Sequence, residues 1–321
     1  MPNVSIVLGI DIGGTNTSFG FVDRAGNIVA ELSMETKPSD AVEDFVSRLH
    51  HRIEEVRTGL PSHHSLCGIG IGAPNANYYR GTIEKAVHLS WGETVDFAGL
   101  IKKYYNIPVS ITNDANAAAL GEMLFGNARG MKNFMVVTLG TGLGSGIVVD
   151  GRLLYGSRGF ARELGHTVVD PMGRQCRCGK KGCLETYASA TGLVKTALLL
   201  ITERCDPSPL RAMDSKEITS KMIFDLAREG DAIALEAFDQ TAKILGMKLA
   251  DAVALTGPEA IFLSGGLSMA GDILLKPTQQ YMEDFLFSAY KGSVKLMLSG
   301  MAPGKSAILG AAALIWGELD L

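Results

Sequence analysis

One pattern of apolar run, glycine-rich turn and apolar return occurs twice in this chain, and it constrains the fold more than any other feature. The first copy spans Leu8–Asp23, with its turn at residues 11–15. The second spans Val136–Gly151, and its turn lies 127 residues after the first. Both segments read as strand, tight turn and returning strand. Their similarity indicates an internal duplication.

Apolar periodicity predicts strands that alternate with helices, which is typical of an α/β fold. We expect strands at residues 4–10, 67–73, 107–112, 135–139 and 260–263. We expect helices at residues 41–58, 95–105, 115–125, 187–203, 215–228, 231–254 and 306–317. The boundary falls near residue 113 and separates a smaller N-terminal domain, 1–113, from a larger domain, 114–321. A C-terminal helix, about 305–317, is able to pack back on the N-terminal domain.

Length and composition narrow the function classes. The 321 residues carry a net charge of −4, which argues against a protein that binds nucleic acid through phosphates. No apolar stretch approaches the ~20 residues needed to cross a bilayer, so no membrane association is expected. The first residues lack a basic segment and read as a strand rather than a signal peptide, so we expect a cytoplasmic protein.

Three cysteines lie within eight residues, in the run Cys176-x-Cys178-Gly-x-x-Gly-Cys183, and His166 precedes them by ten residues. Three thiolates and one imidazole complete a closed tetrahedral zinc shell. Because no coordination position remains for water, we expect zinc to order a loop and not to perform chemistry. Free thiols in a mobile loop are the alternative. A nucleic-acid zinc knuckle is disfavoured, since the unit is single and lacks nearby aromatic residues for base stacking.

The glycine turns have the chemistry of phosphate sites, because glycine lets successive N–H groups converge on an anion. Ordinary hairpins are the alternative. A strand rather than a helix follows each of the two repeated turns, so neither is a Rossmann or P-loop motif. Asp11 either caps its hairpin or holds Mg²⁺, directly or through water. A third turn, Ser264-Gly265-Gly266, ends a strand and could face a nucleotide.

Several polar residues could bind a polyhydroxyl ligand. Asn113 and Asp114 follow a buried strand and open a helix, where an Asp could also serve as the N-cap. Glu163 and Glu185 stand close in sequence to the expected zinc ligands, which would fix them in space. A carboxylate accepts two hydroxyl protons and an amide both donates and accepts. Solvated surface positions are the alternative for each.

Together these motifs resemble the ROK family (repressors, open reading frames, kinases) and, within it, the bacterial glucokinases. The matching motifs run through the whole chain and include Asp11-x-Gly13-Gly14-Thr15, Gly70-x-Gly72-Ala73-Pro74, Asn113-Asp114-Ala115-Asn116-Ala117, Gly140-Thr141-Gly142-x-Gly144, Glu163-x-Gly165-His166, the run from Cys176 to Glu185, and Ser264-Gly265-Gly266. The cysteine run with its upstream histidine is the most specific of them.

The resemblance implies an actin-like, ribonuclease-H-like fold of two α/β domains around a cleft. It implies transfer of the ATP γ-phosphoryl group to a hexose 6-hydroxyl, with glucose as the first candidate. Asp114 is then the general base, and the sugar contacts are Gly72, Asn113, Asp114, Glu163, His166 and Glu185. His166 would place one ring nitrogen on zinc and the other toward the sugar. The Mg·ATP contacts are Asp11, Gly13, Gly14, Thr15, Gly140, Thr141 and Gly142, with Gly265 and Gly266 near the nucleoside. The family also suggests a homodimer or homotetramer.

The chain departs from the common family pattern at three places. Asn16 stands where many members have Lys, Ser145 stands where Gly is frequent, and residues 75–79 replace a Gly-Pro continuation. Kinases for mannose, fructose, allose, N-acetylglucosamine or N-acetylmannosamine therefore remain alternatives. A sugar sensor without turnover is a further alternative. A ROK repressor is disfavoured, because ten residues before Asp11 are too few for a helix-turn-helix.

Overall fold

The computed structural model describes residues 3–86, 89–302 and 304–320, and the chain divides into two compact units. Unit 1 comprises Met1–Met131, Leu153–Arg162 and Gly300–Leu321. Unit 2 comprises Lys132–Arg152 and Glu163–Ser299. These units differ from the domains expected with a boundary at residue 113, since the helix that begins there belongs to unit 1.

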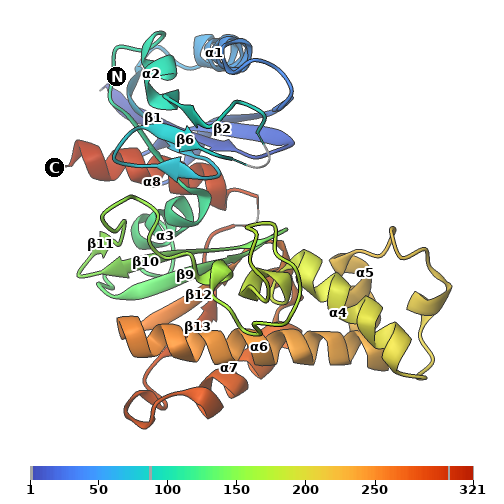
Figure 1. Cartoon of the computed structure of the whole chain (residues 1–321). Helices are drawn as coiled ribbons and strands as arrows, with labels where there is room; N and C mark the ends of the chain where they lie inside the picture. The colour runs from blue at the N-terminus through green and yellow to red at the C-terminus, as the bar shows by residue number, and fades with distance from the viewer. Residues whose placement is uncertain (1–2, 87–88, 303, 321) are drawn as a thin grey trace. The chain divides into compact units, whose positions relative to one another are not determined.

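The main sheet of unit 1 has five strands: β1 (Val4–Ile12), β2 (Asn16–Asp23), β3 (Ile28–Glu35), β4 (His64–Gly72) and β8 (Val109–Thr112). Their order is β3-β2-β1-β4-β8. Figure 1 labels β1 and β2 of this sheet. The β3-β2-β1 part is antiparallel, whereas β4 runs parallel to β1 and β8 runs parallel to β4. A smaller antiparallel sheet contains β5 (Ala76–Asn77), β6 (Thr82–Glu84) and β7 (Thr94–Val95).

Four helices belong to unit 1: α1 (Val42–Thr58), α2 (Phe97–Lys102), α3 (Asp114–Leu124) and the C-terminal α8 (Ser306–Leu319). α8 packs on β1, β4 and β8 and also on α3. The contact with the sheet is close, because a Cβ atom added at Gly70 would lie 1.9 Å from the Ala311 carbonyl oxygen. This packing is the reason that α3 stays with the N-terminal sheet instead of beginning a second domain.

The sheet of unit 2 also has five strands: β9 (Phe134–Leu139), β10 (Leu143–Val149), β11 (Arg152–Leu153), β12 (Ala260–Ser264) and β13 (Lys295–Leu298). Their order is β11-β10-β9-β12-β13. β9 and β10 are antiparallel, and β12 runs parallel to both β9 and β13. The two sheets thus share a hairpin followed by two parallel strands on the same side of its first strand. This correspondence is the one expected of a duplicated unit.

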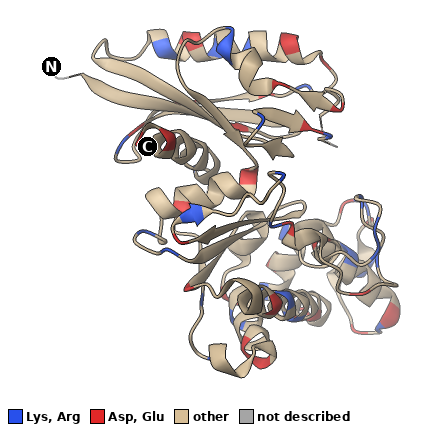
Figure 2. Ribbon diagram, turned by 60° about the vertical axis from the view of Figure 1, so that its left-hand side comes forward, with Lys and Arg blue, Asp and Glu red and all other residues tan. Residues whose placement is uncertain are grey.

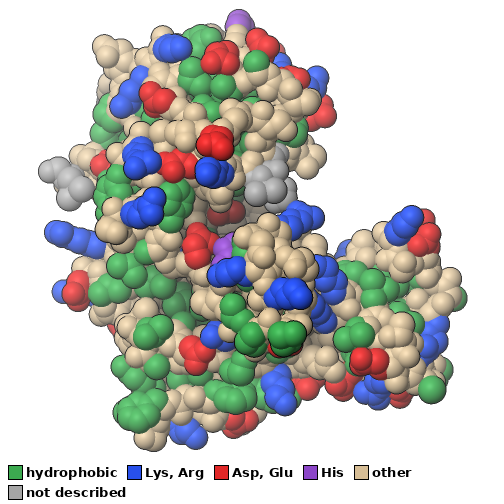
Figure 3. Space-filling view, in the orientation of Figure 1, with side chains coloured by type: hydrophobic (Ala, Val, Ile, Leu, Met, Phe, Trp, Pro, Cys, Tyr) green, Lys and Arg blue, Asp and Glu red, His purple; other side chains and the backbone are tan. Residues whose placement is uncertain are grey.

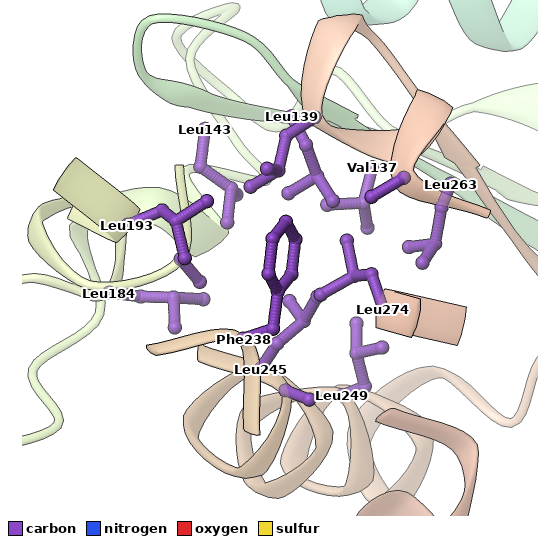
Figure 4. Packing of buried hydrophobic residues seen from close by; sticks show 14 of the residues in the cluster. Val137, Leu139, Leu143, Leu184, Leu193, Phe238, Leu245, Leu249, Leu263 and Leu274 are labelled. Atoms are coloured by element: carbon purple, nitrogen blue, oxygen red, sulfur yellow. The ribbon is translucent and has the colours of Figure 1, made fainter. Parts of the chain in front are cut away.

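The core of unit 2 lies between this sheet and helices α4 (Ala190–Glu203), α5 (Ser220–Arg228), α6 (Ala232–Thr256) and α7 (Asp272–Phe285). Phe238 of α6 points into a ring of leucine and valine side chains from the sheet, α4 and α7 (Figure 4). This side chain is 1% exposed. A separate cluster of buried apolar residues forms the core of unit 1.

Most expected elements are present with shifted ends, and a few differ. The helix expected at 95–105 is divided into β7 and the short α2, because Asp96 accepts a hydrogen bond from the Gly99 N–H and so caps a new helix start. The helices expected at 187–203 and 215–228 begin at Ala190 and Ser220. Strand β3 and helix α7 were not predicted.

Charged side chains of both signs are interspersed along both units (Figures 2 and 3). No single-sign patch dominates the face shown in Figure 3. Among the described residues, no helix combines the length and the apolarity that crossing a bilayer requires.

Candidate functional site

The carboxyl ends of three parallel strands in unit 1 bring the predicted residues together. Asp11 of β1 pairs with Gly72 of β4, and Gly72 pairs with Thr112 of β8. Asn113 and Asp114 follow directly and begin α3. A Cβ atom at Gly72 would lie 3.7 Å from the Asp11 carboxylate, so the glycine leaves space beside that side chain. The carboxyl edge of a parallel sheet is where α/β proteins place ligand groups.

Asn113, rather than Asp114, is the N-cap of α3. Its Oδ1 atom accepts a hydrogen bond of 2.8 Å from the Asn116 N–H. The Asp114 carboxylate is therefore not needed for that cap, although it accepts a 2.8 Å bond from the Ala115 N–H. Asp114 retains access to solvent. The surrounding protein nevertheless removes part of its hydration and raises its pKa.

The pKa of Asp11 is raised as well. Burial, together with the neighbouring negative charge of Asp114, raises the pKa of this carboxyl from 3.8 to about 7. Two carboxyl groups thus share one end of the sheet of unit 1, and the charge of Asp114 disfavours the charged form of Asp11. A cation bound between or beside them would relieve this repulsion, which is consistent with the expected magnesium contact at Asp11.

The turn between β1 and β2 is fixed by hydrogen bonds within the turn and from Thr36. The Gly13 N–H donates to the Asn16 carbonyl, and the Thr36 hydroxyl donates 2.8 Å to the Gly13 carbonyl. The Thr36 N–H also donates to the Thr15 carbonyl. Thr15 itself is exposed. The turn is therefore fixed from the side of Thr36, a residue that no sequence motif indicated.

The corresponding turn of unit 2 is fixed from the start of α4. The Ala190 N–H donates to the Gly140 carbonyl, and the Thr191 hydroxyl donates 2.8 Å to the Thr141 carbonyl. Gly265, at φ +87°, packs on the end of β9, because an added Cβ atom there would lie 2.7 Å from the Leu139 carbonyl oxygen. The second and third glycine turns thus lie beside each other. Gly266 begins a five-residue 3₁₀ helix, Gly266–Ala270.

The predicted metal ligands converge in unit 2. The donor atoms of His166, Cys176, Cys178 and Cys183 all lie within 4.8 Å of one another. Cys176 Sγ is 3.7 Å from His166 Nδ1, and Cys178 Sγ is 3.6 Å from Cys183 Sγ. A tetrahedral zinc ion with bonds of about 2.0–2.3 Å needs donor atoms roughly 3.3–3.8 Å apart. The residues therefore fit zinc, with Nδ1 facing the metal position and Nε2 directed elsewhere.

The two glutamates of unit 2 flank this cluster differently. Glu185 Oε1 lies 3.7 Å from His166 Nδ1, and its other oxygen faces the second glycine turn, 2.7 Å from a Cβ atom built at Gly142. Glu163 is exposed and precedes the 3₁₀ helix Leu164–His166. The buried Ser145 hydroxyl accepts a 3.4 Å bond from the Leu164 N–H. Ser145, a departure from the family pattern, thus anchors the segment that carries Glu163 and His166.

An aromatic cluster in unit 1 was not predicted. Tyr78 and Tyr155 stack with ring centroids 4.2 Å apart and an interplanar angle of 9°. The Tyr78 hydroxyl donates to the carboxylate of Glu318 on α8, and the guanidinium of Arg162 lies 5.5 Å from the centre of the Tyr155 ring. These residues are far apart in sequence and form no motif, so nothing in the sequence indicated that they meet.

Comparison with known proteins yields a family and several relatives. The ROK family profile matches residues 7–318. A glucokinase from Halalkalibacterium halodurans is 38% identical over 87% of this chain and 85% of its own. The crystal structure of a ROK family glucokinase from Streptomyces griseus in complex with glucose and AMPPNP superimposes with a TM-score of 0.82, at 32% identity, over 96% of this chain and 98% of its own.

A regulator is similar as well. The crystal structure of a ROK family transcriptional regulator, a homologue of the E. coli MLC protein, superimposes with a TM-score of 0.88 at 29% identity. The match covers 98% of this chain but 78% of the regulator. Likeness of fold therefore does not by itself separate kinases from regulators, and the side chains of the site have to decide.

Proposed function

The chain belongs to the ROK family, and from this premise we propose that it is an ATP-dependent hexose kinase that phosphorylates the 6-hydroxyl of glucose. It has the actin-like, ribonuclease-H-like α/β fold of the ROK sugar kinases. The glucokinase relatives and the complex with glucose and AMPPNP support this activity.

The observation that carries the proposal is the state of Asp114. Its carboxylate follows the end of β8, reaches solvent and is spared from N-capping by Asn113. Poor hydration raises its pKa, which makes the carboxylate a stronger base than an exposed aspartate. In the proposed reaction Asp114 accepts the proton of the 6-hydroxyl while the hydroxyl oxygen bonds to the γ-phosphorus. The bond between that phosphorus and the β,γ-bridging oxygen breaks, and ADP leaves.

The phosphate contacts are proposed for the glycine turns of both units. N–H groups and hydroxyls at Gly13, Gly14, Thr15, Gly140, Thr141 and Gly142 would bind the phosphate oxygens, and Gly265 and Gly266 would contact the nucleoside. Asp11 would hold Mg²⁺, directly or through water. Magnesium supplies charge neutralisation on the transferred phosphoryl group. With Asn16 in place of a lysine, this neutralisation depends more strongly on the metal.

The sugar contacts proposed in unit 1 are Gly72, Asn113 and Asp114. Those proposed in unit 2 are Glu163, His166 and Glu185. Zinc at His166, Cys176, Cys178 and Cys183 would have a structural role, since its four ligands leave no open position. With Nδ1 directed at the metal, His166 would keep Nε2 for a sugar hydroxyl. We also propose that the protein acts in the cytoplasm as a homodimer or homotetramer, which sedimentation analysis would test.

A single substitution tests the central assignment. Asp114→Asn keeps the size of the side chain and removes its basicity. We expect kcat for glucose phosphorylation to fall by about 10²–10⁴-fold, the usual contribution of a general base. Glucose affinity, measured by calorimetry, should change little. A variant whose kcat stays within about tenfold of the wild type would refute the base role.

Asp44→Asn is the matched control, because Asp44 is an exposed carboxylate in the first turn of another helix, α1. Its kinetics should equal those of the wild type.

The wild-type enzyme should then be compared across glucose, mannose, fructose, allose, N-acetylglucosamine and N-acetylmannosamine by kcat/KM. A higher kcat/KM for another sugar would identify that sugar as the preferred substrate. Sugar binding with no turnover at all would indicate a non-catalytic regulator instead of a kinase.

A further inference from the structure

Arg162 has a backbone conformation that long side chains rarely adopt. Its φ angle is +74°, in the left-handed region that favours glycine. The residue is nevertheless only 9% exposed, so its guanidinium is held inside the protein rather than in water. Backbone strain of this kind persists only where surrounding contacts enforce it, and it often marks a functional position. Arg162 immediately precedes Glu163.

The guanidinium is held by two neighbouring residues. Its Nη1 atom donates a 3.1 Å hydrogen bond to the Leu154 carbonyl. Its central carbon lies 5.5 Å from the centre of the Tyr155 ring, within the range of a cation–π contact. Tyr155 in turn stacks on Tyr78, which is bonded to Glu318 of α8. The arginine therefore closes one side of a rigid aromatic stack.

This stack reaches the segment that carries Asp114. The side chains of Tyr155 and Thr112 share a hydrogen bond. Thr112 is fully buried, ends β8, and accepts a 2.8 Å bond from the Asn116 side-chain amide. Asp114 lies between these two residues in the sequence, so the corner that presents its carboxylate is fixed at Thr112 and at Asn116.

The charge of Arg162 also acts on Asp114. The guanidinium stabilises the carboxylate and lowers its pKa, against the opposite effect of poor hydration. The negative charge of Asp114 in turn raises the pKa of Asp11 on β1. The other titratable groups of this network, Tyr78, Tyr155 and Glu318, contact Arg162 or the stack.

We propose that Arg162 is a positioning residue for Asp114, which fixes the orientation of that carboxylate through Tyr155 and through its own positive charge. The inference rests on the proposed function of Asp114 and adds a residue to it. It also accounts for an arginine at a backbone position where glycine would be less strained.

Three substitutions at this position separate charge from stability. Arg162→Met removes the charge at similar length, Arg162→Lys keeps it, and Arg162→Gly relieves the positive φ angle. We expect kcat to fall by roughly tenfold to a hundredfold in the Met and Gly variants, with the KM for glucose within about threefold of the wild type. Arg162→Lys should recover most of the loss. A kcat that follows the melting temperature instead of the charge would overturn the proposal.

A double-mutant cycle tests whether Arg162 acts through Asp114. In the Asp114→Asn background, Arg162→Met should lower the residual turnover by less than about threefold, because the group it positions is already lost. An equal loss in both backgrounds would refute this inference and leave the base role intact. An Asp114→Asn enzyme within about tenfold of the wild type would instead refute the base role, and this inference with it. The exposed Arg158, in the same segment, supplies the control Arg158→Met, which should leave kcat unchanged.

Discussion

At the scale of single residues, the two neighbouring carboxyl groups predict an unusual pH dependence of stability. The pKa of Asp11 is raised to about 7 in the folded protein from an ordinary value of 3.8. Folding therefore favours its protonated form, and this stabilisation is lost as the pH rises through about 7. Asp114 shifts in the same direction. We expect the melting temperature of the ligand-free protein to fall between about pH 5 and pH 8, by roughly 1–2 °C for each kcal/mol of stability that is lost.

The variant Asp11→Asn mimics the protonated carboxyl and should lose much of this dependence. It should melt higher than the wild type at about pH 8, and the difference should shrink toward about pH 4, where the carboxyl of the unfolded wild type also becomes protonated. Calorimetry without magnesium gives both values, and Asp44→Asn again serves as the control. Identical pH profiles for the wild type and Asp11→Asn would contradict the shifted pKa of Asp11.

Residues that share a short segment could be predicted, and residues that meet only in space could not. Cys176, Cys178 and Cys183 carry their chemistry within eight residues, and the structure gathers them with His166. Tyr78, Tyr155 and Arg162 each look unremarkable in sequence. Their contact depends on the return of residues 153–162 to unit 1, which no local pattern encodes.

At the scale of elements, the close packing of α8 on the sheet of unit 1 depends on small residues. A Cβ atom at Gly70 would meet the Ala311 backbone at 1.9 Å, a contact that no side-chain rotation relieves. Gly70→Ala should therefore push α8 away from β4 and destabilise the protein by about 1–3 kcal/mol. The midpoint of chemical unfolding measures this loss.

Helix α8 itself contains a glycine at which substitution by alanine should have the opposite effect on stability. Gly317 of α8 is exposed, and nothing lies within 4 Å of an added Cβ atom there. Gly317→Ala should raise the unfolding free energy by about 0.5–1 kcal/mol, because alanine restricts the unfolded chain more and suits a helix better. If both variants shifted stability in the same direction, close packing of α8 on β4 would not explain the glycine at position 70.

Helices and strands in which apolar residues recur at regular spacing were predictable, and the exceptions have physical causes. α7 was missed because Pro277 interrupts its sequence: this proline lies inside the 14-residue helix, where it cannot donate a backbone hydrogen bond. β3 alternates half-buried and exposed residues and carries two glutamates and one serine, so its apolar signal is weak. The ends of α2, α4 and α5 are set by capping residues Asp96, Ser189 and Thr219, each of which accepts a bond from the helix start.

At the scale of the whole molecule, the repeated hairpin predicted the correspondence of the two sheets but not the division of the chain. The strand orders β3-β2-β1-β4-β8 and β11-β10-β9-β12-β13 follow the same plan. The chain crosses between the units four times. The return of the C-terminal helix to the N-terminal unit was expected, whereas the return of residues 153–162 was not. A boundary drawn once along the sequence, at residue 113, cannot describe such a path.

Zinc is expected to link the stability of unit 2 to sugar binding. A zinc ion bound by the three cysteines and His166 would hold the segments 163–166 and 176–183 together, and Glu185 lies beside His166. Removal of the metal frees these segments, which should lower the melting temperature and raise the KM for glucose by roughly 10–100-fold. The KM for ATP should change less, because the glycine turns are fixed by Thr36, Ala190 and Thr191 and not by the cluster.

Two exposed cysteines make a matched pair for this test. Cys178 belongs to the cluster and Cys205 does not. Cys178→Ser should reduce the bound zinc, measured by elemental analysis, from about one equivalent to below about half and reproduce the rise in the glucose KM. Cys205→Ser should change neither value. A wild-type protein with intact thiols and less than about half an equivalent of zinc would show that the four residues serve another purpose. A glucose KM unaffected by zinc loss would instead show that His166 and Glu185 are held in place by the protein alone.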